Sequence, residues 1–190
     1  EKIFDAALEQ AGVVRVDSPN ELLDTAETFA KCKPAIGRRM AVLTDGGGHG
    51  VMATDFCERF KLEAPVLSRA TQEKLRAILR PHCPIKNPVD LAGTPEADMW
   101  VFDRCLEVLL DDPDVDGVII VEMDVPKSMA ARVQKANKPV VMHSIYQPQQ
   151  PECLRYLSDN GIPVFGSVDA AVRSMGTLVS YADRRKALEE

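Results

Sequence analysis

Short β-prone runs alternate with helical segments along most of the chain, as read from its apolar and polar positions. The pattern predicts strands at 39–44, 64–67, 115–121, 139–142 and 162–165. The run 115–121 is nearly all apolar, which is typical of a parallel strand covered on both faces. Helical patterns separate or follow these strands, at about 49–60, 68–79, 94–110, 129–136, around Leu154 and from 168 to 183–185. We therefore predict an α/β fold, a flavodoxin-like doubly wound five-stranded parallel sheet of order 2-1-3-4-5.

The first 33 residues have no sheet of their own. A helical pattern over 1–11 ends at Gly12, and a β-prone run over 13–16 leads to a helix capped by Ser18. The same pattern recurs 149 positions later, where Gly161 replaces Gly12 and Ser167 replaces Ser18. Together with the absence of a starting Met, this suggests a helix–strand–helix remnant of another domain. We expect 1–33 to be that remnant, 34–38 a linker, 39–184 the main flavodoxin-like domain and 185–190 a tail, with 13–16 outside the main sheet.

The glycine-rich segment Gly46–Gly50 lies between the first predicted strand and its helix. Glycines let a backbone approach a ligand closely, and the first N–H groups of a helix have no partner inside it. These features favour a phosphate-sized anion at the loop, with a tight turn that binds nothing as the alternative. The loop lacks the Lys-Ser/Thr of a P-loop, and Val51 breaks the dinucleotide-binding spacing. The strand order brings Glu122 and Asp124, after the third strand, to the same crevice.

Charge and cysteine content narrow the class of protein. The net charge of −6 gives no general attraction to nucleic acid or to an anionic membrane. No apolar run approaches the roughly 20 residues that span a bilayer. Five scattered cysteines form no disulfide or zinc pattern and favour a reducing, cytoplasmic location. Glu122 and Asp124 are possible acid–base groups or Mg²⁺ ligands, but two acids at a strand end are also ordinary loop chemistry, and we predict no metal site.

Three motifs carry a resemblance to a known family. They are RRMAVLTDGGGHGV (38–51), NPVDL (87–91) and DPDVDGV (112–118), preceded by QAGVVRVDSPNELL (10–23). The chain resembles the NDP-forming acyl-CoA synthetases, the family of ADP-forming acetyl-CoA synthetase and succinyl-CoA ligase. The resemblance implies a parent enzyme that converts an acid, CoA and a nucleoside triphosphate to acyl-CoA, the diphosphate and phosphate. The acyl group and the choice between ADP and GDP stay open.

The family relays phosphate through a histidine, and the phosphate lies between the amino ends of two helices, one from each flavodoxin-like domain. The resemblance places the phosphate on Gly46, Gly47, Gly48, His49 and Gly50. It places Asp45, Asn87, Asp90, Glu122 and Asp124 at the edge of the site. The phosphorylated histidine belongs to a Ser-His-Thr-Gly type motif that we expect upstream of Glu1. Two departures stand out: Asp45 replaces the usual Asn, and His49 replaces Pro or Ala.

The resemblance also bears on cofactors and partners. It implies that this segment binds no cofactor itself, whereas the full-length enzyme uses CoA, ATP/ADP and Mg²⁺. The CoA-binding, phosphohistidine and ATP-grasp domains would belong to the same protein or to a partner subunit, in an oligomer. We expect the segment alone to have no ligase activity.

Several alternatives stay open. The chain could be a non-catalytic ligand-sensing domain of a synthetase-like protein acetyltransferase, or a receiver-type phosphoacceptor at Asp45, although the fifth strand lacks the Lys that receivers use. His49 is either a phosphoryl acceptor or a solvated loop histidine. His143 lies either in the site or simply at the sheet edge. Asn87 and Asp90 either shape the loop or contact a ligand.

Overall fold

The computed structural model describes residues 2–189 except 97, 123–125 and 145–150. Five parallel strands form one sheet of order β2-β1-β3-β4-β5. They are β1 (Met40–Thr44), β2 (Val89–Asp90), β3 (Gly117–Glu122), β4 (Val140–Ser144) and β5 (Val164–Phe165). The helices are α1 (Lys2–Gln10), α2 (Pro19–Lys31), α3 (Gly47–Arg59), α4 (Arg69–Ile78), the 3₁₀ turn η1 (Thr94–Glu96), α5 (Trp100–Leu110), α6 (Met129–Lys135), α7 (Pro151–Asp159) and α8 (Val168–Glu189). The predicted fold and strand order are confirmed.

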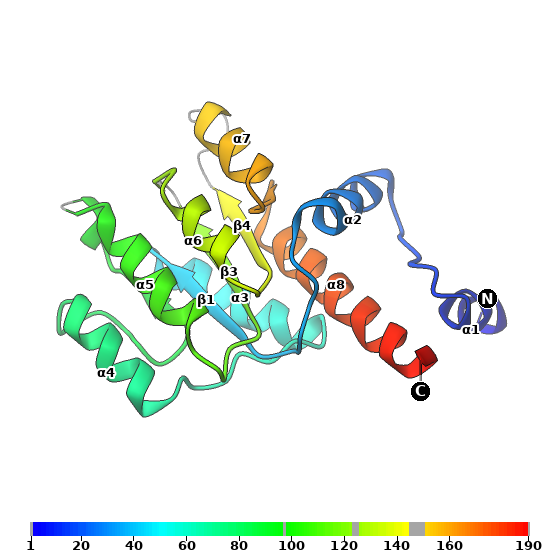
Figure 1. Ribbon diagram of the computed structural model, residues 1–190, viewed down its shortest axis with the longest axis horizontal. Helices are drawn as coiled ribbons and strands as arrows, with labels where there is room; N and C mark the ends of the chain where they lie inside the picture. The colour runs from blue at the N-terminus through cyan, green and yellow to red at the C-terminus, as the bar shows by residue number, and fades with distance from the viewer. Residues whose placement is uncertain (1, 97, 123–125, 145–150, 190) are drawn as a thin grey trace.

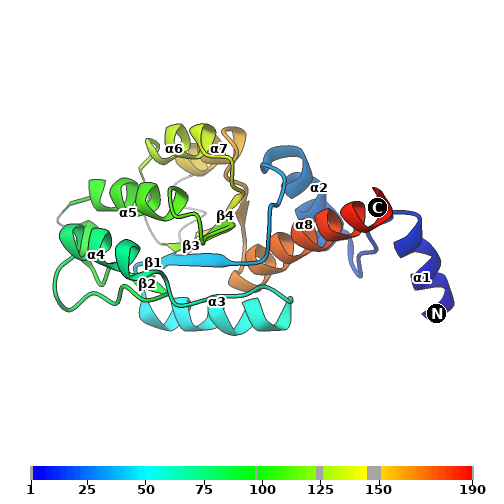
Figure 2. The ribbon, with the colours of Figure 1, turned by 60° about the horizontal axis from the view of Figure 1, so that its bottom comes forward.

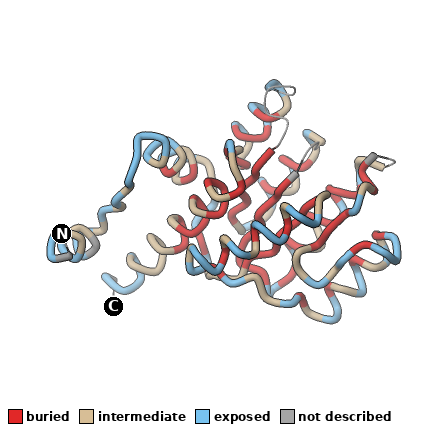
Figure 3. The backbone as a smooth tube through the Cα atoms, turned by 180° about the vertical axis from the view of Figure 1, so that it is seen from behind, coloured by how far each residue is buried: buried red, intermediate tan, exposed pale blue. Residues whose placement is uncertain are grey.

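Helices cover both faces of the sheet (Figures 1 and 2). Helices α3 and α8 lie on one face, and α4, α5, α6 and α7 lie on the other. The centre of strand β3 is apolar because both of its faces are covered: Val118 and Ile120 face one core, whereas Ile119 and Val121 face the other. Buried residues concentrate in the sheet and on the helix faces that meet it (Figure 3). Among the described helices, none combines the length and apolarity that a bilayer crossing requires.

The second strand differs from the prediction. Residues 64–67 form no strand, and β2 comes from the segment predicted as a loop, with Val89 paired to Leu43. The side chain of Asn87 explains the difference. Its Oδ1 accepts the Val42 N–H at 2.9 Å, and its Nδ2 donates to the Met40 carbonyl at 2.9 Å and to the Pro65 carbonyl at 3.0 Å. An amide side chain thus occupies the edge of β1 that the predicted strand would have paired with.

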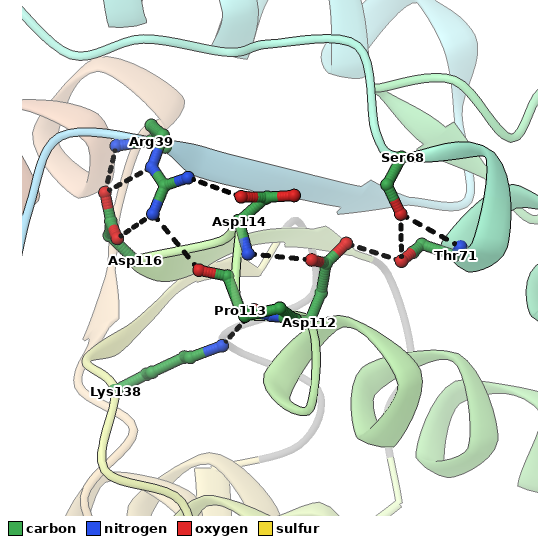
Figure 4. Close-up of polar contacts among 8 residues, drawn as sticks. All are labelled: Arg39, Ser68, Thr71, Asp112, Pro113, Asp114, Asp116 and Lys138. Atoms are coloured by element: carbon green, nitrogen blue, oxygen red, sulfur yellow. Dashed lines mark hydrogen bonds and ion pairs between the residues drawn. The ribbon is translucent and has the colours of Figure 1, made fainter.

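A cluster of charged residues closes the amino edge of the sheet (Figure 4). We call it the amino-edge clasp: Arg39, Asp112, Asp114, Asp116 and Lys138. The Arg39 guanidinium donates to both oxygens of Asp116, at 2.9 and 3.1 Å, and to Asp114 at 2.9 Å. Buried Asp112 accepts from the Thr71 hydroxyl at 2.5 Å, and the Lys138 ammonium donates to its carbonyl. The motif DPDVDGV therefore joins β1 to the start of β3.

The first 33 residues do not behave as one unit. Helix α2 packs on α8, where the rings of Phe29 and Tyr181 meet edge to face at 5.0 Å and Arg173 donates to Asp24 at 3.1 Å. Helix α1 has no buried residue among those described, and it lies near the end of α8 (Figure 1). Residues 13–16 form no strand and stay outside the main sheet, as predicted.

The last helix is longer than predicted. The sequence pattern fades at 183–185, but α8 continues to Glu189. The extra residues Lys186, Ala187 and Leu188 are strong helix formers, so the helix persists after its contact with the core has ended.

Candidate functional site

The glycine loop lies at the carboxyl edge of the sheet, where the strand order reverses. Gly46 is the N-cap of α3, and residues 47–50, predicted as a loop, form the first turn of that helix. Strand β1, which precedes them, lies between β2 and β3. Such a reversal leaves a crevice in which open α/β sheets bind ligands. The Thr44 hydroxyl fixes the turn by accepting the Gly46 N–H at 3.1 Å. The first α-helical hydrogen bond of α3 runs from Gly50 N to the Gly46 carbonyl at 3.0 Å.

Three backbone donors are left at the start of α3. Within the described residues, no acceptor receives a hydrogen bond from the N–H of Gly47, Gly48 or His49. Gly46 is the N-cap and provides no side chain to bind them. These donors, and the partial positive charge at a helix amino end, favour an anion.

The glycines of the loop have different roles. A Cβ on Gly50 would lie 2.8 Å from the Thr44 methyl group and 3.2 Å from Pro88, so this glycine lets α3 pack closely on the sheet. A Cβ on Gly47 would lie 3.1 Å from Oδ2 of Asp90. Around Gly48, by contrast, a Cβ would meet nothing in the described part of the chain within 4 Å. Close packing therefore explains why position 50 is glycine, but it does not explain why position 48 is glycine.

Two carboxylates adjoin the same helix end. Oδ1 of Asp45 accepts the Gly93 N–H at 2.7 Å. Asp90 is buried, and its Oδ1 accepts the Ala92 N–H at 2.9 Å. Both acids thus shape the loops around α3, as Asn87 does from the edge of β1. Their negative charge also opposes the binding of an anion at Gly47, so the site is electrostatically mixed.

Two histidines face this edge from different elements. His49 is half-buried in the first turn of α3. His143 is buried on β4, and its Nδ1 donates to the Phe165 carbonyl at 3.1 Å, because a carbonyl only accepts. Burial lowers the pKa of His143, opposed by its hydrogen bond to Phe165; His49 lowers that pKa further and Asp169 raises it. The pKa of His143 therefore lies below the ordinary value of an imidazole.

The two remaining predicted acids are only partly defined. Glu122 ends β3, and its backbone pairs with Ser144 in register. Asp124 lies outside the described residues. Among the residues that are described, no three His, Cys, Asp or Glu side chains form a group that could hold a metal ion.

Three of the five cysteines are poor nucleophiles. Burial raises the pKa of Cys32, Cys57 and Cys105 to about 12 in each case. Sequence reasoning missed the contributions of Thr44 and Gly93. No local pattern distinguishes them, because Gly93 comes to Asp45 only through the path of the chain after β2.

Comparisons with known proteins place this geometry in context. No family model matches the chain. It is 33% identical over 184 residues to acetate–CoA ligase [ADP-forming] I of Archaeoglobus fulgidus, covering 94% of this chain and 26% of that protein. It is 29% identical to the alpha subunit of acetate–CoA ligase [ADP-forming] II of Pyrococcus furiosus, covering 95% of this chain and 42% of the subunit. The chain thus spans less than half the length of these relatives.

Solved structures agree in fold. A crystal structure of a Pyrococcus horikoshii protein superposes with a TM-score of 0.83 at 28% identity, covering 97% of this chain and 44% of the other. A dinucleotide-forming acetyl-coenzyme A synthetase of Candidatus Korarchaeum cryptofilum, in complex with phosphate and ADP, gives a TM-score of 0.86 at 22% identity. It covers 99% of this chain and 42% of that one.

Proposed function

We propose that this chain, a relative of the ADP-forming acyl-CoA ligases over nearly its whole length, supplies a phosphate-holding helix to such an enzyme. The reaction is acid + CoA + NTP to acyl-CoA + NDP + phosphate, through a phosphohistidine. That histidine belongs to a domain outside this chain. In this proposal the loop Gly46–Gly50 holds the phosphoryl group while it moves between the acyl phosphate, the histidine and the nucleotide.

One observation carries the proposal. The amino end of α3 offers three backbone donors without acceptors among the described residues, at the crevice between β1 and β3. Gly48 adds to it, because open space beside its Cα leaves room for a ligand. Fixed N–H groups stabilise a transferring phosphoryl group without reorganising during the reaction.

Other parts of the enzyme supply the rest of the chemistry. CoA, ATP/ADP and Mg²⁺ bind to the CoA-binding and ATP-grasp domains, on the same protein or on a partner subunit. Because Asp45 and Asp90 oppose an anion, the loop needs the second helix of the phosphohistidine domain to hold phosphate firmly. We therefore expect the 190-residue chain alone to form no acyl-CoA, and acyl-CoA formation by the purified chain would refute this.

The test uses the full-length protein with two substitutions at one position. Gly48→Glu places a carboxylate in the anion crevice, and Gly48→Ala is the matched control because a Cβ fits there. Removing one backbone or side-chain donor of this kind from an active site lowers kcat by a factor of about 10²–10³. We expect Gly48→Glu to lose acyl-CoA formation by about that factor and to accumulate less phosphohistidine, while Gly48→Ala keeps most of both. Equal activity of the two variants would contradict the proposal.

A second candidate follows from Asp45 and Asp90. Two carboxylates beside the helix end would suit a ligand-sensing domain of a synthetase-like protein acetyltransferase, which transfers no phosphate. The full-length sequence separates the two candidates: an intact phosphorylatable histidine upstream favours the ligase, and its loss favours the sensor.

A further inference from the structure

One carboxylate oxygen beside the start of α3 has no donor among the described residues. It belongs to Asp90, which ends β2 and is only 9% exposed. Oδ1 of Asp90 accepts the Ala92 N–H at 2.9 Å, whereas Oδ2 receives no hydrogen bond from the described part of the chain. Oδ2 is not one of the fully covered side-chain atoms that lack a partner, so it keeps surface that a small ligand can reach. Because buried carboxylate oxygens normally accept hydrogen bonds, Oδ2 suits a ligand that brings its own donor.

The glycine at position 47 leaves this oxygen open. A Cβ there would lie 3.1 Å from Oδ2 of Asp90, closer than an ordinary van der Waals contact, and would cover it. Gly47 is also the first residue of α3. Its N–H and those of Gly48 and His49 have no acceptor among the described residues. An acceptor without a donor therefore lies beside three donors without an acceptor.

Asp45, the other carboxylate at this helix end, differs from Asp90. Its Oδ1 already accepts the Gly93 N–H at 2.7 Å. Asp45 therefore contributes negative charge to the site, whereas Asp90 contributes both charge and an oxygen that no described donor binds. A bare anion at the loop meets repulsion from both acids. An anion that carries an O–H group replaces the repulsion at Asp90 with a short, charge-assisted hydrogen bond.

Hydrogen phosphate and sulfate differ in this one respect. Both are tetrahedral and doubly charged in mildly alkaline buffer, but only hydrogen phosphate carries an O–H group. Backbone N–H donors and the partial charge of a helix amino end attract the two anions alike. A site that accepts a hydrogen bond from a ligand O–H rejects the analogue without it, because the acceptor of the site is then left unpaired.

From these features we infer that Asp90 makes the start of α3 selective for orthophosphate over sulfate. The P–OH group donates to Oδ2 of Asp90, and the other phosphate oxygens accept the N–H groups of Gly47, Gly48 and His49. The inference rests on the proposed function, and it identifies the free phosphate of that reaction as the species that the loop distinguishes. Asp90 is then a specificity residue, and the glycine at position 47 keeps its oxygen accessible.

Parallel NMR titrations of the 190-residue chain with phosphate and with sulfate test this selectivity. Both titrations use the same mildly alkaline buffer at constant ionic strength, so the two anions carry the same charge. We expect saturable backbone amide shifts at Gly47, Gly48 and His49 with phosphate. Sulfate should bind more weakly by about tenfold or more, because a hydrogen bond to a charged acceptor is lost.

Two variants and a matched control test the residues. Asp90→Asn keeps an acceptor for the Ala92 N–H and turns the other end of the side chain into a donor, so sulfate should bind about as well as phosphate. Gly47→Ala covers Oδ2 but keeps its own N–H, and it should also lower the preference for phosphate. Asp45→Asn removes the same charge from the same helix end. Both anions should then bind more tightly, and the ratio of their affinities should stay as it is in the unaltered chain.

Three outcomes would overturn the inference. Equal affinity of the unaltered chain for phosphate and sulfate would do so while leaving the loop as an anion site. Loss of the preference in Asp45→Asn as well as in Asp90→Asn would show that charge, and not an acceptor for the P–OH group, sets the ratio. No saturable shift with either anion would overturn the proposed function together with the inference. If the amide spectrum shows that Asp90→Asn is unfolded, Gly47→Ala decides, since an unchanged ratio in that variant also contradicts the inference.

Discussion

The two edges of the sheet use charged side chains in opposite ways. At the amino edge, Arg39 donates hydrogen bonds to both oxygens of Asp116 and to one of Asp114, so the charged groups of the clasp bind one another (Figure 4). At the carboxyl edge, Asp45 accepts the Gly93 N–H from the loop after β2, and Asp90 accepts the Ala92 N–H of its own loop. The donors at the start of α3 remain without acceptors among the described residues.

We propose that this difference separates a stabilising motif from one that binds a ligand. DPDVDGV and the glycine loop both carry the family resemblance, but they lie at opposite ends of the strands. A motif whose polar groups bind one another stabilises the fold, whereas one that leaves donors available is positioned for a ligand. The following predictions test whether that division holds.

The largest effect on the free energy of unfolding is expected at Asn87. Its side chain binds the edge of β1, between the amino and carboxyl edges of the sheet. Asn87→Ala leaves the Val42 N–H and the Met40 carbonyl without their partners inside the sheet. Two unsatisfied buried groups lower the free energy of unfolding by about 3 kcal/mol. Urea unfolding measures the change, with Asn160→Ala as the control, since Asn160 is bonded only at the surface. Equal stability of the two variants would show that the Asn87 side chain does not replace a strand.

The amino-edge clasp should contribute somewhat less to the free energy of unfolding than the Asn87 side chain does. Asp116→Ala removes the buried acceptor of the Arg39 backbone N–H and guanidinium, and we expect a loss of about 2 kcal/mol. Asp114→Ala is the matched control, because the Asp114 side chain is 67% exposed and surface ion pairs contribute little. Urea unfolding under the same conditions compares the two. If both variants lose the same amount, burial of Asp116 is not what makes the clasp stabilising.

The clasp should also weaken in acid. Burial raises the pKa of Asp116, but the hydrogen bonds and charge of Arg39 outweigh it, and the net pKa lies below its ordinary value. A depressed pKa means stability that is complete above the unfolded-state value of about 4 and is lost as pH falls through the folded-state value. The stability difference between the unaltered chain and Asp116→Asn should therefore be constant from about pH 5 to 7 and shrink below about pH 4. Protonation of His143 changes the stability of both proteins alike and cancels in the difference. A stability difference that grows as the pH falls would show that the pKa of Asp116 is not lowered by folding.

The sequence predicts most of this fold because burial dictates the pattern. The run 118–121 had to be apolar to lie between two helix layers, and position 50 of α3 had to be glycine to pack on Thr44 and Pro88. The misplaced second strand shows the limit. Residues 64–67 have β-prone side chains, but the amide of Asn87 occupies the edge of β1, and no periodicity reveals a side chain that replaces a strand.

The candidate site was predictable in its donors but not in its surroundings. Spacing alone identifies Gly46–Gly50 as the start of a helix after a strand. The contact between Asp45 and Gly93 joins positions 48 residues apart, and the approach of Asp90 to Gly47 depends on the register of β2. Neither follows from local sequence, because both depend on how the loops cross the sheet edge.

The smallest effect concerns the affinity of the isolated loop for phosphate. The donors of Gly47, Gly48 and His49 attract the anion, whereas Asp45, Asp90 and the net charge of −6 oppose it. Under the proposed function the second helix of the site belongs to another domain, so water screens the attraction in this chain, and we expect millimolar binding, about −4 kcal/mol at the 1 M standard state. Backbone amide shifts are followed by NMR in a phosphate titration at constant ionic strength.

Saturable shifts should appear at Gly47, Gly48 and His49, whose N–H groups have no acceptor among the described residues. Asp45→Asn should strengthen binding because it removes a negative charge near the helix end while keeping an acceptor for Gly93. Gly48→Pro should weaken it, since proline has no N–H to donate. Shifts confined to surface lysines and arginines, with none in the loop, would show that the free donors at the carboxyl edge do not form an anion site. The contrast between the two edges would then be one of structure alone, with unpaired N–H groups that water satisfies.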